Sequence, residues 1–394
     1  MARRCGKLAP HSVAHLPASN RPLTLLHWQE PPPHTGNPIA SRLPKAQPSM
    51  QLYTLDPMSD SRWDDLVASH PSASVFHRRG WLKALAGTYG YRPIVLTSSP
   101  PGTRLSNGIA FCEIRSWITG NRLVSLPFAD HCEPLLNETW DSCELAEWMR
   151  TEFRQHNWKY IELRPLSWPM DLDCPLAASQ SFWFHTLDLT PSLDQILRNL
   201  DKNSVQRRIR RAERAHLSYE SGCSEELLKD FYRLLMITRR RHRLLPQPLA
   251  WFQNLVACMN PSLDIRVARK DGIPIAAILT LRHRGTVVYK YGCSDEKFHP
   301  LAGMPFLFWK LIEESKIAGA EQIDFGRTDL ENKGLLKFKD QFGTTRRRLT
   351  YFRHPESKKK WAAAADLPVA RRLFSVLPDA LSSRAGRLLY RHIG

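Results

Sequence analysis

The sequence predicts an α/β protein whose central sheets are mixed and flanked by helices. Strand-like and helix-like segments alternate from Met50 onward, and segments of each kind recur in a similar order in two successive sets. No letter-by-letter repeat accompanies this recurrence, so it indicates a duplicated architecture and not a short repeat unit. The length of 394 residues suits two domains of about 150 residues each. We therefore expect two successive α/β domains.

The first set contains two helices, three strands, a third helix and a buried strand, at residues 61–69, 78–88, 93–98, 108–116, 122–127, 145–156 and 160–164. A linker with two prolines is expected at residues 168–181. The second set contains a strand, three helices, three strands, a helix and a strand, at residues 184–189, 193–216, 225–241, 249–259, 263–269, 273–283, 286–293, 304–318 and 322–326. Its first helical segment is expected to break near residues 200–202. The sets predict domains at residues 50–175 and 176–354.

The formal net charge of +18 is concentrated at the two ends of the chain. Residues 1–49 carry six Lys/Arg against one Glu, and residues 346–394 carry twelve Lys/Arg against three Asp/Glu. Subtracting these +5 and +9 from +18 leaves +4 for residues 50–345. A folded body so close to neutral argues against a broad basic surface, and we expect no DNA partner.

The eight cysteines are scattered, with no CxxC pair and no His/Cys spacing that suits zinc. This pattern predicts no metal site and favours reduced thiols, as in a cytoplasmic protein. No apolar run approaches the roughly 18 residues that are needed to cross a bilayer.

Both ends of the chain fall outside the periodic segments. Residues 1–49 contain nine prolines and no usable periodicity, which predicts a disordered or non-native extension, with a transit peptide as the alternative. Residues 355–394 form a basic amphipathic tail. Its part from residue 358 onward suits the anionic inner face of a membrane, and packing back on the folded body is the alternative.

The stretch Val287–Gly343 has the pattern of a strand, a loop, a helix, a second strand and a segment with the letters FKDQFG. The backbone N–H groups of such a loop and the N-terminus of such a helix attract negative charge. The stretch therefore predicts a site for a phosphate-bearing donor. An ordinary connection between parallel strands is the alternative.

Six motifs follow one another along the chain: VFHRRGWLKAL, LPFADHCEPL, YIELRP, NSVQRRIRRAERAHLSYE, YKYGCSDEKFHPLAGM and IDFGRTDLENKGLLKFKDQFG. Through these motifs, residues 50–354 resemble the FemAB-like branch of the GNAT acyltransferase superfamily, with its peptidoglycan-bridge aminoacyltransferases and exopolysaccharide-associated proteins. The resemblance implies two tandem GNAT-like domains, an acyl or aminoacyl donor carried on CoA or tRNA, and transfer to an amine. The long helical hairpin of some tRNA-using members has no counterpart in the sequence.

Lys339 falls on the lysine of the FK pair in the last motif. Acyl transfer passes through a tetrahedral oxyanion, which a fixed ammonium group stabilises. We expect Lys339 to stabilise this oxyanion, with a surface lysine beside Lys337 as the alternative. Phe338 and Tyr291, in the last two motifs, are expected to bind substrate.

Asp324, Gly326 and Arg327 lie at the end of a strand, where α/β sheets bind ligands. Gly326 would allow a close backbone approach, and Arg327 could bind a phosphate or carboxylate. A surface pair between Arg327 and Asp329 is the alternative. Asp324 and Asp130 are the candidates for a general base.

Asp130, His131 and Cys132 directly follow a strand. A Cys–His nucleophile is conceivable, but neighbours along a strand point to opposite faces and rarely form such a pair. We expect Asp130 and His131 to line the acceptor cleft, and Cys132 to be dispensable. Arg164, at another strand end, is expected to face the same cleft or to form a structural ion pair.

Residues 202–214 form the one internal basic cluster of the sequence. Apolar residues at helical spacing occupy one side of it, and arginines cover the remaining arc. We expect Arg207 and Arg211 to contact phosphates of tRNA or of a lipid-linked diphosphate acceptor. A solvated helix face is the alternative.

These features favour a cytoplasmic acyltransferase, peripheral to the membrane, that moves an acyl group from acyl-CoA to a small-molecule or lipid-linked amine. Bacterial cell-envelope or exopolysaccharide metabolism is the expected setting. One alternative is an aminoacyl-tRNA-dependent peptidyltransferase of the peptidoglycan-bridge type. Another is a non-catalytic scaffold for envelope assembly.

Overall fold

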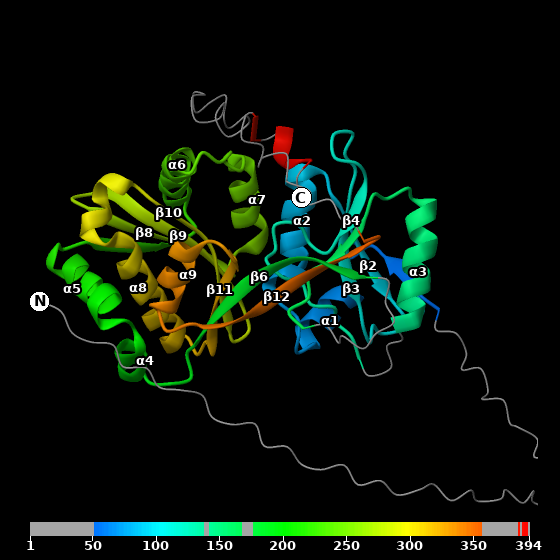
Figure 1. Ribbon diagram of the computed structural model, residues 1–394, viewed down its shortest axis with the longest axis horizontal. Helices are drawn as coiled ribbons and strands as arrows, with labels where there is room; N and C mark the ends of the chain where they lie inside the picture. The colour runs from blue at the N-terminus through cyan, green and yellow to red at the C-terminus, as the bar shows by residue number, and fades with distance from the viewer. Residues whose placement is uncertain (1–50, 138–141, 168–175, 357–384, 387, 393–394) are drawn as a thin grey trace, which may run out of the picture. The chain divides into compact units, whose positions relative to one another are not determined.

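The computed structural model describes residues 51–137, 142–167, 176–356, 385–386 and 388–392 (Figure 1). The expectations for the N-terminal extension and for most of the basic tail lie outside these residues. Within them, helices and strands alternate around one mixed sheet, so the predicted α/β class is confirmed.

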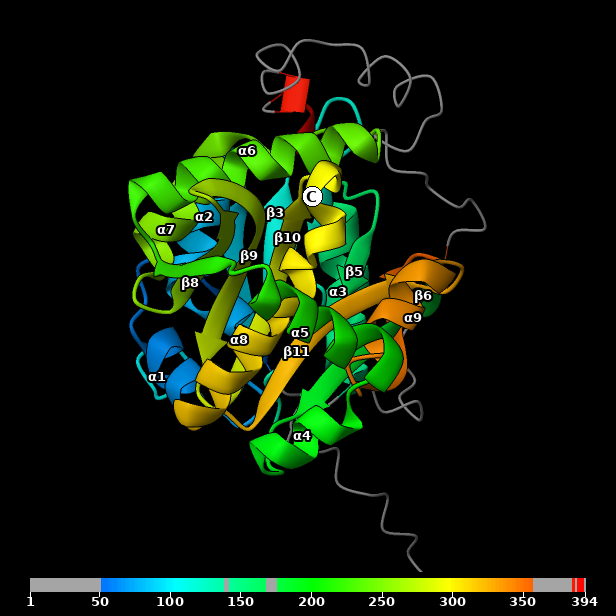
Figure 2. The same cartoon turned by 90° about the vertical axis from the view of Figure 1, so that its left-hand side faces the viewer.

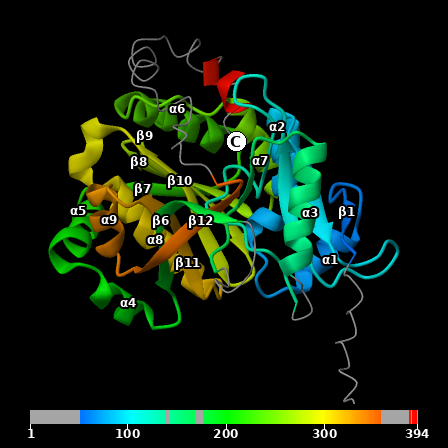
Figure 3. The same ribbon diagram turned by 45° about the vertical axis from the view of Figure 1, so that its right-hand side comes forward.

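The sheet has 12 strands in the order β1-β2-β3-β4-β5-β12-β6-β11-β10-β9-β8-β7. The first half of the sheet consists of the strands β1 Tyr53–Leu55, β2 Arg92–Thr97, β3 Ile109–Ile114, β4 Arg122–Val124 and β5 Ile161–Leu163. The second half is β7 Ser218–Gly222, β8 Leu263–Lys270, β9 Ile273–His283, β10 Thr286–Ser294 and β11 Gln322–Asp329. Between the halves run β6 Ala177–Asp188 and β12 Thr345–His354 (Figures 1 and 3).

The strand order is the same from either edge of the sheet when β1–β5 are matched with β7–β11 and β12 with β6. In both halves four antiparallel strands end in a parallel pair, β4 with β5 and β10 with β11. β6 follows the first half in sequence but pairs with β11, and β12 follows the second half but pairs with β5. The two expected α/β units are thus halves of one sheet that exchange their last strands.

Helices cover both faces of this sheet. They are α1 Arg62–Ser69, α2 Arg79–Tyr89, α3 Ser142–Gln155, α4 Leu193–Asn199, α5 Arg207–Arg214, α6 Glu225–Arg241, α7 Leu249–Met259, α8 Gly303–Ile317 and α9 Lys333–Asp340. Along β9, Ala277 and Leu279 pack in a core with α1, α2, α6 and α7, whereas Ala276 and Ile278 pack with α5 and α8. This alternation places α6 and α8 on opposite faces, and Figure 2 shows α5 beside α8.

Two expected boundaries can be compared with the structure. The predicted break near residues 200–202 is confirmed, since α4 ends at Asn199 and a π-helical turn, Lys202–Gln206, precedes α5. The expected linker at 168–181 is too long, because β6 already begins at Ala177. Ala177 pairs with Arg353 of β12, and this distant strand pairing decides the conformation where the local sequence suggests a loop.

One apolar core joins the two halves of the sheet. It combines residues of α1 and α2 with residues of α6 and α7. The rings of Trp81 on α2 and Trp251 on α7 meet edge to face, with centroids 5.3 Å apart, and both side chains are fully buried. The halves therefore cannot separate without exposing this core.

The described end of the basic tail packs on the folded body. The Tyr91 hydroxyl donates to the carbonyl of Tyr390 at 2.7 Å, and the Tyr390 hydroxyl donates to the carbonyl of Leu245 at 3.0 Å. The buried Arg122 guanidinium donates to the carbonyl of His392 at 2.9 Å. Among the described residues, no helix has the length and apolar character to cross a membrane.

Gly80 and Gly87 lie on the same helix, α2, in different surroundings. A Cβ at Gly80 would lie 2.3 Å from the carbonyl oxygen of Cys258 in α7, whereas one at Gly87 would meet nothing closer than 3.6 Å. Gly80→Ala should push α2 from α7 and lower the free energy of unfolding by about 1–3 kcal/mol. Gly87→Ala should leave it unchanged or raise it by up to about 1 kcal/mol. Urea unfolding of both variants tests this, and equal effects would contradict the close helix packing.

Candidate functional site

The parallel strands β10 and β11 pair only at their beginnings. Their register runs from Thr286 opposite Gln322 to Val288 opposite Asp324 and then ends. Irregularities follow in both strands, between Tyr289 and Tyr291 where β10 pairs with β9 and between Asp324 and Gly326 where β11 pairs with β6. Such bulges change the direction of side chains and often lie next to active sites.

A partly buried cluster of charged side chains lies where this pairing ends. Asp130, from the segment after β4, has its carboxylate 3.4 Å from Lys290 Nζ and 3.8 Å from Arg327 Nε. Burial opposes ionisation of the Asp130 carboxyl, but the charges of Lys290, Arg327 and Lys339 prevail and hold its pKa below the usual value. Asp130 is therefore an anion at neutral pH. Asp130 of the first half thus forms ion pairs with Lys290 and Arg327 of the second half.

His131 and Asp324 form the second pair of this cluster. The His131 Nε2 atom lies 3.0 Å from Asp324 Oδ2, and both side chains are buried. The other Asp324 oxygen accepts a hydrogen bond from the Gly326 amide at 2.6 Å. Both carboxylate oxygens of Asp324 therefore have a hydrogen-bond partner.

Lys339, on α9, is buried with 2% of its surface exposed. Its ammonium group donates to the carbonyls of Gly326 and Arg327, each at 3.0 Å, so two of its three N–H donors are used. Burial lowers the pKa of Lys339 to about 8, although Asp130 and Asp324 act in the opposite direction. Lys339 is thus a fixed cation at neutral pH and not a solvated surface lysine.

Gly326 lies between Lys339 and Asp130. Its φ of +72° is in the left-handed region, and a Cβ there would lie 2.5 Å from Asp130 Oδ2. The residue must therefore be glycine for both conformation and space. The close approach expected at this position is made by the Asp130 carboxylate.

Arg327 and Arg164 are connected to the cluster through Tyr351 of β12. Arg327 donates to the Tyr351 hydroxyl at 2.7 Å, and this hydroxyl donates to the Asp130 carbonyl at 2.6 Å. The Arg164 guanidinium lies 5.1 Å above the Tyr351 ring and donates to Glu162 at 2.8 Å. Arg164 therefore forms a structural ion pair next to the cluster, and Arg327 pairs with Asp130.

The remaining expected residues lie elsewhere. The Tyr291 hydroxyl accepts hydrogen bonds from Gln247 and Trp251 inside the core, at 3.1 and 2.9 Å. Burial raises the pKa of the Cys132 thiol well above its usual value, so no thiolate is available there at neutral pH. Arg207 is exposed. Lys290 is the cation of the cluster that the sequence does not predict, because it lies at the β-bulge between Tyr289 and Tyr291, where strand alternation is interrupted.

A cavity of about 520 Å³ lies at the N-terminus of α8. Three arginines line it, Arg208, Arg211 and Arg241, together with Phe338 and residues of the β10–α8 loop. The first N–H groups of a helix have no partner within it and favour anions. The cavity thus combines a helix N-terminus with three guanidinium groups, next to the Phe338-Lys339 pair.

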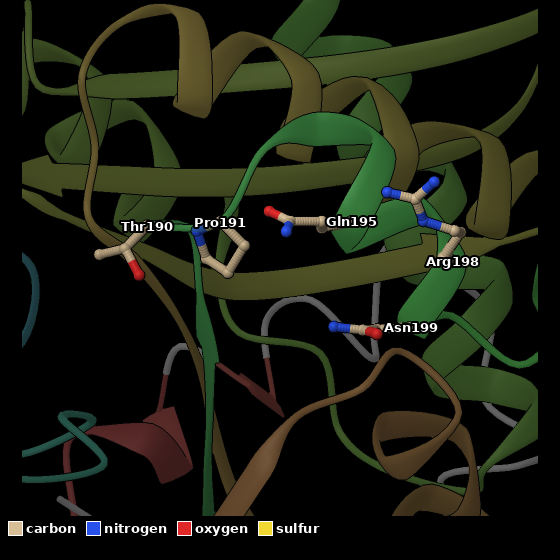
Figure 4. A pocket seen from close by; sticks show the side chains of 5 residues that line it. All are labelled: Thr190, Pro191, Gln195, Arg198 and Asn199. Carbon is tan, nitrogen blue, oxygen red and sulfur yellow. The ribbon is translucent and has the colours of Figure 1, made fainter.

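Another hollow, of about 470 Å³, lies on α4. Figure 4 shows its lining, in which Gln195, Arg198 and Asn199 extend from the helix beside Thr190 and Pro191. It shares no residue with the charged cluster, and all its polar side chains are exposed. We therefore place the candidate site at the cluster and not here.

A comparison with protein families matches residues 201–340 to the acetyltransferase (GNAT) domain. These residues are similar to a GNAT domain. The matched stretch spans α5 to α9 and so contains the arginine-lined cavity, Asp324 and Lys339. A search of curated proteins found no match.

Solved structures share the fold over both halves of the sheet. FemX superposes with a TM-score of 0.60 at 12% identity, over 77% of this chain and 97% of FemX. L-PGS from Bacillus licheniformis superposes with a TM-score of 0.54 at 15% identity, over 85% of this chain and 97% of L-PGS. The C-terminal domain of a putative lysylphosphatidylglycerol synthetase from Agrobacterium fabrum superposes with a TM-score of 0.51 at 16% identity. The match covers 79% of this chain and 95% of that domain. Together with the GNAT domain, this confirms the expected likeness to the FemAB-like branch at the level of the fold.

Lys339 should make stability depend on pH. Since its pKa is about 8 in the folded protein and 10.5 in an unperturbed lysine, the unfolded state binds more protons between these values, and stability rises with pH there. Between about pH 7 and about pH 9.5, the free energy of unfolding should rise by about 2 kcal/mol more in wild type than in Lys339→Met. Urea unfolding at both pH values measures this, and a pH-independent difference would contradict the lowered pKa.

Proposed function

We propose that the protein is an acyltransferase that moves an acyl group from an acyl-CoA donor to an amine. The observation that carries this proposal is the position of the buried Lys339 ammonium. It lies where β10 and β11 separate, near the carboxylates of Asp130 and Asp324, inside the stretch that matches a GNAT domain. A fixed cation in a water-poor site stabilises a developing oxyanion far better than one in solvent.

The donor would bind in the arginine-lined cavity at the N-terminus of α8. Its phosphates would contact Arg208, Arg211 and the first amides of the helix, which together suit a pyrophosphate. Phe338 lines the same cavity and directly precedes Lys339, so a pantetheine arm that passes Phe338 would bring the thioester to the ammonium.

In the reaction, the neutral amine nitrogen attacks the thioester carbonyl carbon, and a C–N bond forms. The carbonyl electrons move to the oxygen, whose negative charge Lys339 stabilises. When the carbonyl reforms, the C–S bond breaks. The nitrogen loses one proton to a carboxylate of the cluster, which passes it to the departing thiolate, so that an amide and a thiol are formed. Most of the acceleration would come from holding amine and thioester together.

The acceptor in this proposal is a small-molecule or lipid-linked amine of bacterial envelope or exopolysaccharide metabolism, as the resemblance implies. Measurements of donor affinity at several salt concentrations distinguish the two donor classes of the family. An RNA donor requires many phosphate contacts, so its affinity falls steeply with salt. Acetyl-CoA affinity should fall only gently.

Lys339→Met should reduce acyl transfer by about 10²–10³-fold, because it removes the charge that faces the oxyanion. Release of the CoA thiol from acetyl-CoA in the presence of a panel of primary amines measures the rate. Lys337→Met, on the exposed side of the same helix, is the control and should retain wild-type rates. An active Lys339→Met protein would reject the proposed role of the lysine.

Charge reversal at Arg208 and Arg211 should weaken acetyl-CoA binding by at least about tenfold, because phosphate contacts are replaced by repulsion. Arg210→Glu, on the same helix but outside the cavity lining, is the control for the change in net charge. Isothermal titration compares the affinities. Equal weakening in the control would mean that α5 acts only through its overall charge.

A further inference from the structure

The pseudo-symmetry of the sheet places two buried acids, Glu162 and Asp324, at equivalent positions. Val124 of β4 lies opposite Glu162 of β5, Val288 of β10 lies opposite Asp324 of β11, and both parallel registers end there. The two side chains are 1% and 3% exposed. Each acid thus lies where the parallel pair of its half separates.

Two guanidinium groups neutralise Glu162 in the first half. Arg164, two residues further along β5, donates to one oxygen at 2.8 Å. Arg353, directly opposite Glu162 on β12, donates to the other. Burial opposes ionisation of Glu162, but the two arginines lower its pKa below the usual value. A buried carboxylate needs such partners, because removal from water is costly.

Asp324 has neither of these partners. The residue opposite Asp324 on the exchanged strand β6 is Thr186, and two residues further along β11 stands Gly326. Among the described residues, no lysine or arginine forms an ion pair with Asp324, whose side-chain hydrogen-bond partner is His131. The second half therefore has no arginine at the two positions that hold Arg164 and Arg353 in the first half.

A cavity of about 170 Å³ lies beside Asp324 and Thr186. Thr186 occupies the register position opposite Asp324 that Arg353 occupies opposite Glu162. His283 and Arg347 also line the cavity. Arg347 is exposed and its guanidinium lies over the Phe184 ring, 5.3 Å from the ring centroid. His131 also lines this cavity. The other ring nitrogen of His131, Nδ1, is buried with no hydrogen-bond partner in the described part of the chain.

We propose that this cavity binds the protonated amino group of the acceptor, which takes the place of the missing guanidinium. Before the attack, the bound ammonium group gives one proton to the Asp324 carboxylate, so that the neutral nitrogen reacts. The inference rests on the proposed acyl transfer and names the site and charge of its acceptor. The Asp324 carboxylate and the Thr186 hydroxyl supply hydrogen-bond acceptors in the lining, and the unpartnered His131 Nδ1 lies beside them. The limited volume favours a slender primary amine over a branched or secondary one.

The position of the cavity also suits the transfer. Val288, in its lining, belongs to the core packed against α6, whereas Met304 and Phe338 of the donor cavity belong to the core packed against α8. The amine and the thioester would therefore approach from opposite faces of the sheet. They would meet where β10 and β11 separate, near Gly326, whose amide binds Asp324 and whose carbonyl binds Lys339.

Thr186→Arg tests the site, because it restores the guanidinium that the first half holds opposite Glu162. Saturation-transfer NMR with n-butylamine as the probe, and n-butanol as its uncharged control, measures binding to the full-length protein. Wild type should bind the amine at least tenfold more tightly than the alcohol. Thr186→Arg should lose this preference, and Thr151→Arg, on the exposed surface of α3, should keep it. Asp324→Asn, which retains the side-chain shape without the charge, should also lose the preference for the amine. This variant tests the site if Thr186→Arg fails to fold.

Equal binding of amine and alcohol to wild type, or an unchanged amine preference in Asp324→Asn, would overturn the proposed site. Acetyl-CoA titration and thiol release separate this result from a failure of the proposed function. If wild type prefers the amine and the variants lose this preference, but no amine accelerates thiol release, the binding site is supported and acyl transfer from CoA is rejected. If folded Thr186→Arg still releases thiol at the wild-type rate in the presence of the amine, acyl transfer is supported and the proposed amine site is rejected.

Discussion

The antiparallel pairing of β6 with β12 is the interaction on which the rest of the structure depends. Each strand completes the sheet of the other half, and the register between them runs from Thr186 opposite Thr345 to Ala177 opposite Arg353. Through this exchange, Tyr351 of β12 binds both Asp130 of the first half and Arg327 of the second. Without the pairing, Tyr351 could not join the acid to the cation, and only the shared apolar core would hold the two halves together.

The two halves use the same buried position for different purposes. Glu162 is fully neutralised by arginines and fixes strands β5 and β12 to one another, which is a structural role. Asp324 has a histidine, a backbone amide and a cavity instead. Burying a charge without a full set of partners lowers stability, and such an arrangement is typical of sites where a ligand completes the set. A duplicated fold permits this division, because one half can keep the stable pair.

Much of this arrangement could be predicted from local sequence. Alternating patterns predict the helices and strands, and the ordered motifs predict the GNAT-like halves. Asp130, His131, Asp324, Arg327 and Lys339 each lie in a motif, and the structure brings them together. The exchange of strands could not be predicted, because periodicity within a strand says which face is buried but not which distant strand lies beside it. For the same reason the roles of Thr186 and Arg353 became visible only through the strand register.

The exchanged strands also have a consequence for how the protein is made. The edge of β5 is covered by β12, which the ribosome synthesises only after the whole second half of the sheet. A nascent chain therefore carries an open sheet edge throughout that time, and open edges are templates for pairing with other chains. The same connectivity prevents either half from being detached or recombined as an independent module, so the duplicated halves must be inherited and must fold together.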